Sequence, residues 1–276
     1  MRCQQRASER DYVVMIMEEP GEDAKPPDDY RYLVEESRSD GLLLATALRI
    51  PAHAGGVPAI PHVYVNRRGP DHGNDVVMDE PGAVRLFLDS VTGLGHRSVA
   101  LIDGPAEVDT VYRRVSAARR MCTARGIRLT LRHAPPTEEG GWQAARRMLR
   151  QSALPTACGV GSLNQLFGVM AALRGSGVGV PEEMSVVSFD EDECLAFLDV
   201  PVTSVAMPLA ELSSAAVDAL TARIERQPAS DVMIRQPMSL VLRDSVSNPP
   251  RRPAPVISRS PRPRARDLPV SPAPRP

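Results

Sequence analysis

The stretch from Leu154 to Asp192 reads LPTACGVGSLNQLFGVMAALRGSGVGVPEEMSVVSFDED. It opens on a short apolar run at Ala157–Val160 and closes on a second one at Ser185–Phe189. Between them, Asn164–Gly175 carries apolar residues at helical spacing and is followed by a glycine-rich turn. Strands that are apolar along their whole length are typical of parallel sheets covered by helices on both faces. The stretch therefore predicts a strand–helix–strand unit of an α/β fold.

The same alternation continues through most of the chain. Further strands are predicted at Tyr12–Met17, Gly41–Leu44, His62–Val65, Ser98–Ile102, Arg128–Leu131, Thr203–Val205 and Leu240–Leu242. Further helices are predicted at Gly82–Leu94, Thr110–Arg125, Gly141–Gln151 and Leu209–Arg226. So many units exceed the roughly 4–6 strands of an ordinary sheet. The pattern therefore favours two sheets, and hence two subdomains.

Composition limits the class of protein. The chain has 276 residues, of which 42% are hydrophobic and 4% aromatic, so aliphatic side chains must form most of its core. A formal net charge of −1 gives no general attraction to nucleic acid or to a membrane. The four cysteines lie far apart without a C-x-x-C pair, which excludes a disulfide framework or a zinc site and fits a reducing cytoplasm. Since the chain shows neither a signal-peptide core nor an apolar run of roughly 20 residues, we expect a cytoplasmic protein without a membrane partner.

The C-terminal segment differs from the rest. Residues 247–276 are rich in proline and arginine, and Asp267 is their only acid. Proline removes backbone donors and the segment has few apolar residues, so we expect a disordered tail. It is either passive or a contact for nucleic-acid phosphates, and the sequence leaves both open.

Four segments carry a resemblance to a known family. The segments are DGLLLATA with IPHVYVNRR at Asp40–Ala47 and Ile60–Arg68; Asp79 with LGHRSVALIDG at Leu94–Gly104; RVSAARRMCTARGI at Arg114–Ile127; and the opening stretch at Leu154–Asp192. In order and separation they resemble the effector-binding domain of LacI/GalR-type transcriptional regulators. The resemblance covers roughly Tyr12 to Val246.

This resemblance implies a periplasmic-binding-protein-like fold of two Rossmann-like lobes, each a parallel sheet flanked by helices. The first lobe would comprise residues 12–95 and 191–226, and the second residues 96–190 and 227–246. The chain would cross between them near Gly95, Asp190 and Arg226. His96 would lie near a crossing, where we expect a structural role.

The first lobe is expected to be incomplete. RASERDYVVMIM looks like the end of the family's first helix followed by its second strand, so the first strand would be missing. The alternative is that Tyr12–Met17 is itself the first strand and the second is deleted. Only eleven residues precede Tyr12, too few for a helix-turn-helix, so we expect no sequence-specific operator binding by this chain.

The resemblance also implies an effector site at the carboxyl ends of the strands, between the lobes. The matching positions are Arg114 at a helix start, Asp190 at a strand end and Asp79 after the strand VVM; the two acids are otherwise explained as helix caps or solvated loop residues. The family often has Asn-Asp where this chain has Ser162 and Leu163, which weakens the case for a conventional sugar effector.

The function implied is that of a regulator's sensor domain. It would bind a small polar effector, of which a carbohydrate is one candidate, and act as a homodimer; DNA is a partner by family analogy alone. We find no catalytic motif, cofactor motif or metal-ligand spacing, so we expect neither an enzyme nor a metalloprotein. The alternatives are a non-functional or partner-only remnant of such a regulator and a non-regulatory small-molecule-binding protein.

Overall fold

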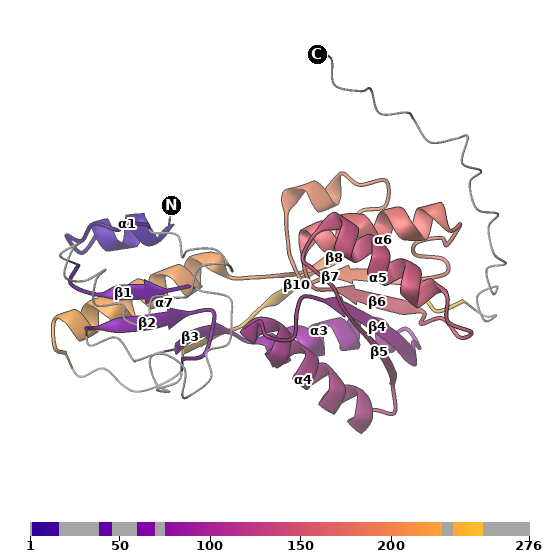
Figure 1. Cartoon of the computed structure of the whole chain (residues 1–276), viewed down its shortest axis with the longest axis horizontal. Helices are drawn as coiled ribbons and strands as arrows, with labels where there is room; N and C mark the ends of the chain where they lie inside the picture. The colour runs from indigo at the N-terminus through magenta and orange to yellow at the C-terminus, as the bar shows by residue number, and fades with distance from the viewer. Residues whose placement is uncertain (1, 17–38, 46–59, 70–74, 228–233, 251–276) are drawn as a thin grey trace, which may run out of the picture.

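The computed structural model describes residues 2–16, 39–45, 60–69, 75–227 and 234–250. They form two lobes that lie side by side along the long axis of the molecule (Figure 1). Each lobe is built on its own sheet, and almost all strands in both sheets run parallel. The predicted two-lobed α/β fold is therefore confirmed. The predicted tail lies outside the described residues from position 251 onward.

The second lobe contains a six-stranded sheet. Its strands are β4 (Ser98–Asp103), β5 (Arg128–His133), β6 (Ala157–Val160), β7 (Ser185–Ser188), β8 (Thr203–Ala206) and β10 (Ser239–Val241). Their spatial order is β10-β8-β7-β6-β4-β5, and only β10 is antiparallel to its neighbour. The five parallel strands, counted along the chain, thus have the order 2-1-3-4-5 of a doubly wound sheet.

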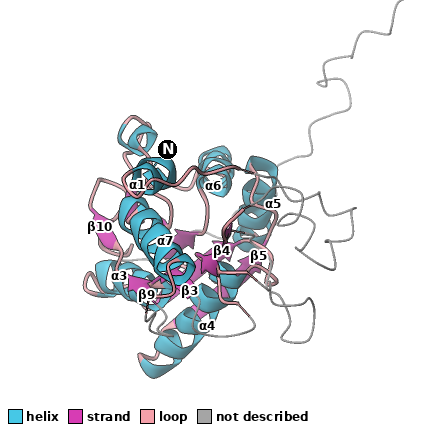
Figure 2. Ribbon diagram, turned by 90° about the vertical axis from the view of Figure 1, so that its left-hand side faces the viewer, coloured by secondary structure: helices cyan, strands magenta, loops and turns pink. Residues whose placement is uncertain are grey.

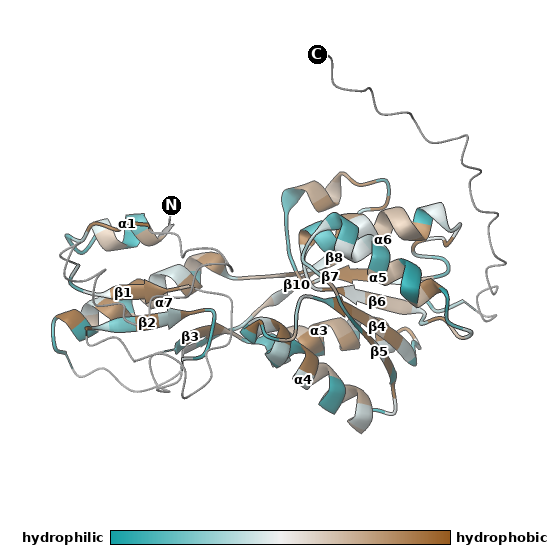
Figure 3. Ribbon diagram, viewed as in Figure 1, coloured by the Kyte–Doolittle hydropathy of each residue, from teal (hydrophilic) through white to brown (hydrophobic). Residues whose placement is uncertain are grey.

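Two helix layers enclose this sheet. Helices α3 (Glu80–Thr92) and α4 (Asp109–Ala124) cover one face, and α5 (Glu138–Leu149) and α6 (Leu163–Gly175) cover the other (Figure 2). In β4, Val99 and Leu101 pack with the first layer, whereas Ala100 and Ile102 pack with the second. Because both faces are buried, the strand is apolar throughout, and Figure 3 shows the hydrophobic residues gathered along the strands.

The first lobe contains a four-stranded parallel sheet. Its strands are β1 (Leu42–Leu44), β2 (His62–Val65), β3 (Asp75–Met78) and β9 (Ile234–Gln236), adjacent in that order. Helix α7 (Leu209–Ile224) packs Leu212, Ala216 and Leu220 against this sheet. The short helix α1 (Arg2–Ser8) lies on α7, where the Arg6 guanidinium donates two hydrogen bonds of 2.9 Å to Asp218.

The strand pairing moves all three predicted crossings between the lobes. The chain leaves the first sheet after Met78, returns to it near Met207, and leaves it again after Gln236. Helix α3 and strand β8 consequently belong to the second lobe, and β9 to the first. The predicted crossings near Gly95, Asp190 and Arg226 are therefore wrong. The reason is that a helical pattern shows which face of a helix is apolar but not which sheet that face covers.

The strand predicted at Tyr12–Met17 is also wrong within its described part. Residues 12–16 form no strand, and the side chains of Val13, Met15 and Ile16 are 91%, 60% and 79% exposed. Helix α1 confirms that a helix precedes this segment. Among the described residues, no strand pairs with the outer edge of β1. An apolar run that finds no neighbouring strand stays outside the sheet, whatever its propensity.

His96 has the structural role that its position predicts. The fully buried ring contacts the Thr156 hydroxyl through Nδ1 at 2.8 Å and the Ser247 carbonyl through Nε2 at 2.8 Å. Ser247 also donates its backbone N–H to the Ser185 hydroxyl. The ring therefore connects the segment that follows β10 to the loop before β4. Burial lowers the pKa of His96, and the bond to Ser247 offsets this only in part.

We expect hydrogen exchange to separate the first apolar segment from the second-lobe core. The amides of Val13–Ile16 should exchange without protection because they make no sheet hydrogen bonds, whereas those of Val99–Ile102 should be among the slowest. Exchange mass spectrometry of the intact chain measures both. Comparable protection of the two segments would show that residues 12–16 are part of a sheet.

We further expect the protein to lose stability when the pH falls below about 6.5, the ordinary pKa of histidine. Because the folded-state pKa of His96 is lowered, the unfolded chain takes up the proton first, and stability rises with pH across the window just below 6.5. Urea denaturation at pH 7.5 and pH 5.5 measures the difference. His96→Gln should flatten this dependence, and an unchanged slope in the variant would assign it to other groups.

Candidate functional site

The candidate site lies where the winding direction of the second sheet reverses, between β4 and β6. The connections that leave β4 and β6 run to helices on opposite faces of the sheet, so no connection covers the strand ends between them, and ligands of such folds bind at this point. Here β4 ends in Asp103, β6 is followed by Gly161, and Asp190 follows β7. Helix α4, which follows β4, brings Arg114 over these ends.

Arg114 is held by two carboxylates. Its Nε donates to Glu80 Oε2 at 2.8 Å, and Nη1 donates to both Asp103 oxygens at 3.1 Å and to the Gly161 carbonyl at 3.3 Å. The guanidinium also lies 4.7 Å from the centroid of the Phe189 ring. Within the described part of the chain, its Nη2 makes no hydrogen bond. The arginine is thus fixed on three sides and retains one free donor.

The group is buried but stays charged. The side chains of Arg114, Glu80 and Asp103 are 7%, 1% and 3% exposed. Burial by itself would lower the pKa of Arg114, but the charges of Asp103 and Glu80 outweigh that effect and raise the pKa above its ordinary value. Removing one partner of such a buried pair costs about 3–5 kcal/mol because a charge is left uncompensated.

Asp190 lies beside this group. Its Oδ2 accepts a hydrogen bond of 3.0 Å from the backbone N–H of Leu163, the first residue of α6. Burial raises the pKa of Asp190, and the Leu163 bond and the charge of Arg114 counteract it only partly. The carboxylate that follows β7 therefore serves the amino end of α6, where Ser162 is the cap and accepts from Gln165.

Asp79 is placed differently. It lies at the first crossing between the lobes, where its backbone N–H donates to the Gln236 carbonyl at 2.9 Å. Its side chain is 3.9 Å from Arg235 Nε and is 28% exposed. No described contact joins it to Arg114 or Asp190. Of the three predicted site residues, the structure thus brings Arg114 and Asp190 together and sets Asp79 against the crossing strand.

Sequence reasoning missed the two carboxylates that bind Arg114. Asp103 ends the apolar run of β4, and Glu80 directly follows Asp79; both positions carry a weak signal, because an acid at a strand end or a helix start is commonly a cap. Their pairing with Arg114 depends on residues 11 and 34 positions apart, which no local pattern shows.

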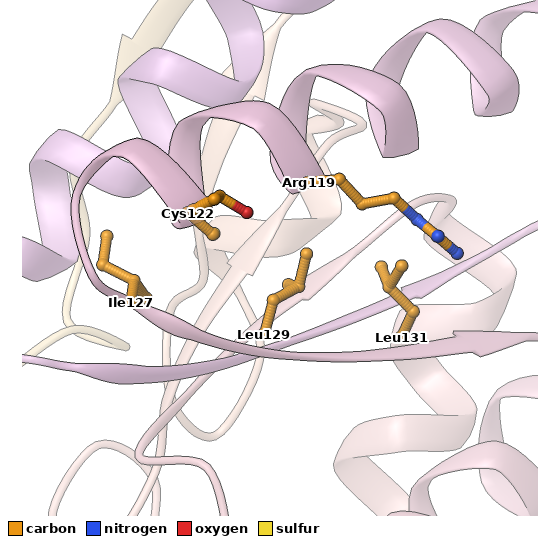
Figure 4. Close-up of a pocket in the computed structure, with 6 residues that line it drawn as sticks. Arg119, Cys122, Ile127, Leu129 and Leu131 are labelled. Carbon is orange, nitrogen blue, oxygen red and sulfur yellow. The ribbon is translucent and has the colours of Figure 1, made fainter.

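Apart from this site, a hollow lies in the second lobe between α4 and β5 (Figure 4). It has a volume of about 410 Å³. Cys122, Ile127, Leu129 and Leu131 form its apolar floor, and Arg119 reaches over one end. Burial raises the pKa of the Cys122 thiol to about 11, so this thiol is not a nucleophile at neutral pH. The hollow offers one charged group and no acid–base pair.

Two other classes of site receive no support from the described residues. None of their histidine, cysteine, aspartate and glutamate side chains gather in a group of three able to hold a metal ion. None of the helices that the structure describes is long and apolar enough to cross a membrane.

A family model, curated relatives and solved structures all match this chain. A family model described as a periplasmic binding protein-like domain matches residues 88–246, more than half of the chain. A curated relative, the HTH-type transcriptional regulator reg1 of Streptomyces lividans, is 30% identical over 183 residues, which cover 62% of this chain and 52% of the relative. The lactose operon repressor of Escherichia coli K12 is 26% identical over 244 residues, or 86% of this chain and 66% of the repressor.

Among solved structures, a dimeric lac repressor with an 11-residue C-terminal deletion superimposes with a TM-score of 0.78 at 22% identity, covering 90% of this chain and 92% of that one. These relatives are transcriptional regulators rather than enzymes. The chain spans about half the length of the Streptomyces relative.

We expect Gly161→Ala to disturb the site specifically. A Cβ at this position would lie 2.1 Å from Asp103 Oδ1 and 3.1 Å from Arg114 Nη1, so the Asp103–Arg114 ion pair would have to shift. The free energy of unfolding should fall by about 1–3 kcal/mol, the usual cost of overpacking a buried position.

Gly175→Ala is the matched control, since nothing lies within 4 Å of its added Cβ at the end of α6. It should be neutral or stabilising by up to about 1 kcal/mol. Urea denaturation compares both variants with the parent. Equal stability of Gly161→Ala and the parent would mean that the Asp103–Arg114 geometry is not as described.

Proposed function

Because this chain belongs to the periplasmic binding protein-like family and carries the effector-binding domain of a LacI-type transcriptional regulator, we propose that its lobes bind a small polar effector between them and thereby control transcription. The observation that carries the proposal is the position of Arg114 and Asp190. Arg114 lies where the winding of the second sheet reverses, Asp190 binds the start of α6 beside it, and the start of α4 contacts the first lobe through Asp109 and Arg68.

The chemistry of these groups favours a ligand rich in hydroxyls. Nη2 of Arg114 is a charged donor without a hydrogen-bond partner among the described residues, and Asp190 adds a charged acceptor that uses one oxygen on Leu163. A donor and an acceptor side by side match a hydroxyl group, which can serve both. A carbohydrate or related polyol is therefore the proposed effector class, and the name of the lactose operon repressor agrees with that class.

The departure at Ser162 and Leu163 has a structural consequence for this proposal. Neither side chain offers a carboxylate, and Asp190 caps the Leu163 N–H at the same place. Asp190 is therefore the acid that we expect to contact the effector on this side of the site. Asp79 remains a third candidate, positioned at the crossing between the lobes.

We also propose that the chain acts as a homodimer, as the related lac repressor does in its solved structure. Large apolar side chains are exposed on the second lobe, with Phe197 at 86% and Leu242 at 71%. Recognition of operator DNA would need residues beyond the effector-binding domain and is a proposal for the whole regulator only.

The effector assignment is tested by ligand screening followed by two variants. A thermal-shift screen of pentoses, hexoses and disaccharides should give a hit, since a ligand at 100 times its Kd stabilises by about 2.7 kcal/mol. Asp190→Asn keeps the side-chain shape and should weaken that ligand by roughly ten- to a hundredfold, because it removes a hydrogen bond to a charged group worth about 1.5–3 kcal/mol.

Asp199→Asn is the control, since this aspartate lies in the same connection between β7 and β8 but its side chain is 90% exposed. Isothermal titration calorimetry should show parental affinity for the control. If Asp190→Asn binds as tightly as Asp199→Asn, Asp190 does not contact the effector.

A further inference from the structure

A second arginine near the start of α4 reaches the other lobe. Arg113 Nη1 donates to the carbonyl of Met78 at 2.8 Å, and Nη2 donates to the carbonyl of Asn66 at 3.3 Å. Met78 is the last residue of β3, and Asn66 directly follows β2. One guanidinium from the second lobe thus holds the carboxyl ends of two neighbouring strands in the first.

Asp109 completes this contact from the preceding turn of the same helix. Its Oδ2 accepts from Arg113 Nε at 2.8 Å and from the backbone N–H of Arg68, in the first lobe, at 3.2 Å. The side chains of Arg113 and Asp109 are 5% and 7% exposed. The ion pair therefore makes three hydrogen bonds across the lobe boundary, and water reaches it poorly, which strengthens each of them.

The neighbouring Arg114 is tied to the same crossing. Arg113 binds the carbonyl of Met78 on one side of Asp79, and Arg114 binds the carboxylate of Glu80 on the other. The first crossing between the lobes is thus held by adjacent arginines of one helix turn. Because they are adjacent on a rigid helix, a displacement of Arg114 moves the backbone that carries Arg113.

We propose that the Arg113–Asp109 pair is an interlobe latch that fixes the orientation of the lobes, and that an effector acts on this latch through Arg114. The second half of the proposal rests on the proposed function. An effector held between Nη2 of Arg114 and Asp190 draws the guanidinium away from Glu80, releases the far side of the crossing and shifts the start of α4. Arg113 is then a positioning residue, which transmits occupancy of the site without touching the ligand.

The latch is tested by a distance between the lobes in the full chain. Nitroxide labels at Glu225→Cys, at the end of α7, and Ala171→Cys, on α6, place one exposed probe on each lobe. The half-buried Cys3 and Cys194 are replaced by serine so that the labels react only there. Pulsed dipolar spectroscopy then reports the distribution of interlobe distances without any ligand.

We expect one narrow distribution in the parent and a broadened or displaced one in Arg113→Met/Asp109→Asn, which removes both charges of the pair and leaves neither orphaned. Arg113→Lys keeps the charge but not the planar fork that reaches two carbonyls, and should broaden the distribution as well. The second variant keeps the test decisive if the double replacement does not fold, which circular dichroism shows.

Arg125→Met is the matched control. Arg125 lies at the other end of α4 and pairs with Asp89 at 2.6 Å within the second lobe, so its loss should leave the distribution unchanged. If a folded Arg113→Lys variant or the folded double variant shows the parental distribution of interlobe distances, the latch is overturned.

Coupling to the effector is read separately, with the sugar that the thermal-shift screen identifies. Saturation with that sugar should displace the parental distribution toward that of the latch variants and have little further effect on them. A bound sugar that leaves the parental distribution unchanged would overturn the coupling. A screen without any hit would count against the proposed effector class, while the ligand-free distances would still decide the latch.

Discussion

The buried guanidinium of Arg114 is the constraint around which the second lobe is arranged. A charge that is 7% exposed must have charged or strongly polar partners, and it has them in Glu80 and Asp103, with the Gly161 carbonyl closing the third side. Glu80 can reach it only if α3 starts immediately after the crossing from the first lobe. Asp103 can reach it only if β4 and α4 diverge at that point. The ion-pair group thus fixes the relation of one crossing, one strand and two helices.

The same constraint explains why position 161 is glycine. The chain passes so close to the Asp103 carboxylate that a methyl group would overlap it. Its φ is not in the left-handed region, so the requirement is one of space and not of backbone conformation. The site and the packing of the sheet are therefore a single structure, and a substitution at the strand end affects both.

Sequence reasoning was most accurate where burial on both faces makes the pattern unambiguous. The strand at Ala157–Val160 was predicted with its observed bounds because a fully apolar run lies between polar or turn residues. It failed where pairing rather than pattern decides. Residues 12–16 are as apolar as many strands but pair with no strand that the structure describes, and β9, at Ile234–Gln236, is a strand because β3 lies beside it. The predicted assignment of α3 to the first lobe is wrong for the same reason.

Two of the four charged residues of the site can be predicted from the sequence, and two cannot. Arg114 and Asp190 stand at motif positions, so the family pattern identifies them; Glu80 and Asp103 are found only when the fold brings them to the guanidinium. The two carboxylates that the sequence does not reveal change the free energy that an effector can gain from Arg114. In a site where an arginine is free, an effector gains a new charge-assisted bond; here the arginine already has two carboxylate partners, and an effector must replace one of them or use the remaining Nη2. Asp103 would keep the hydrogen bond from the Gly104 N–H at 2.8 Å if it lost Arg114, whereas Glu80 would be left as a buried carboxylate without its one ion-pair partner among the described residues, so replacing Glu80 requires that its carboxylate also moves. Since Glu80 is the first residue of α3, any such exchange would act on the crossing between the lobes, and this is the physical basis on which we propose that the arrangement of the lobes depends on what occupies the site.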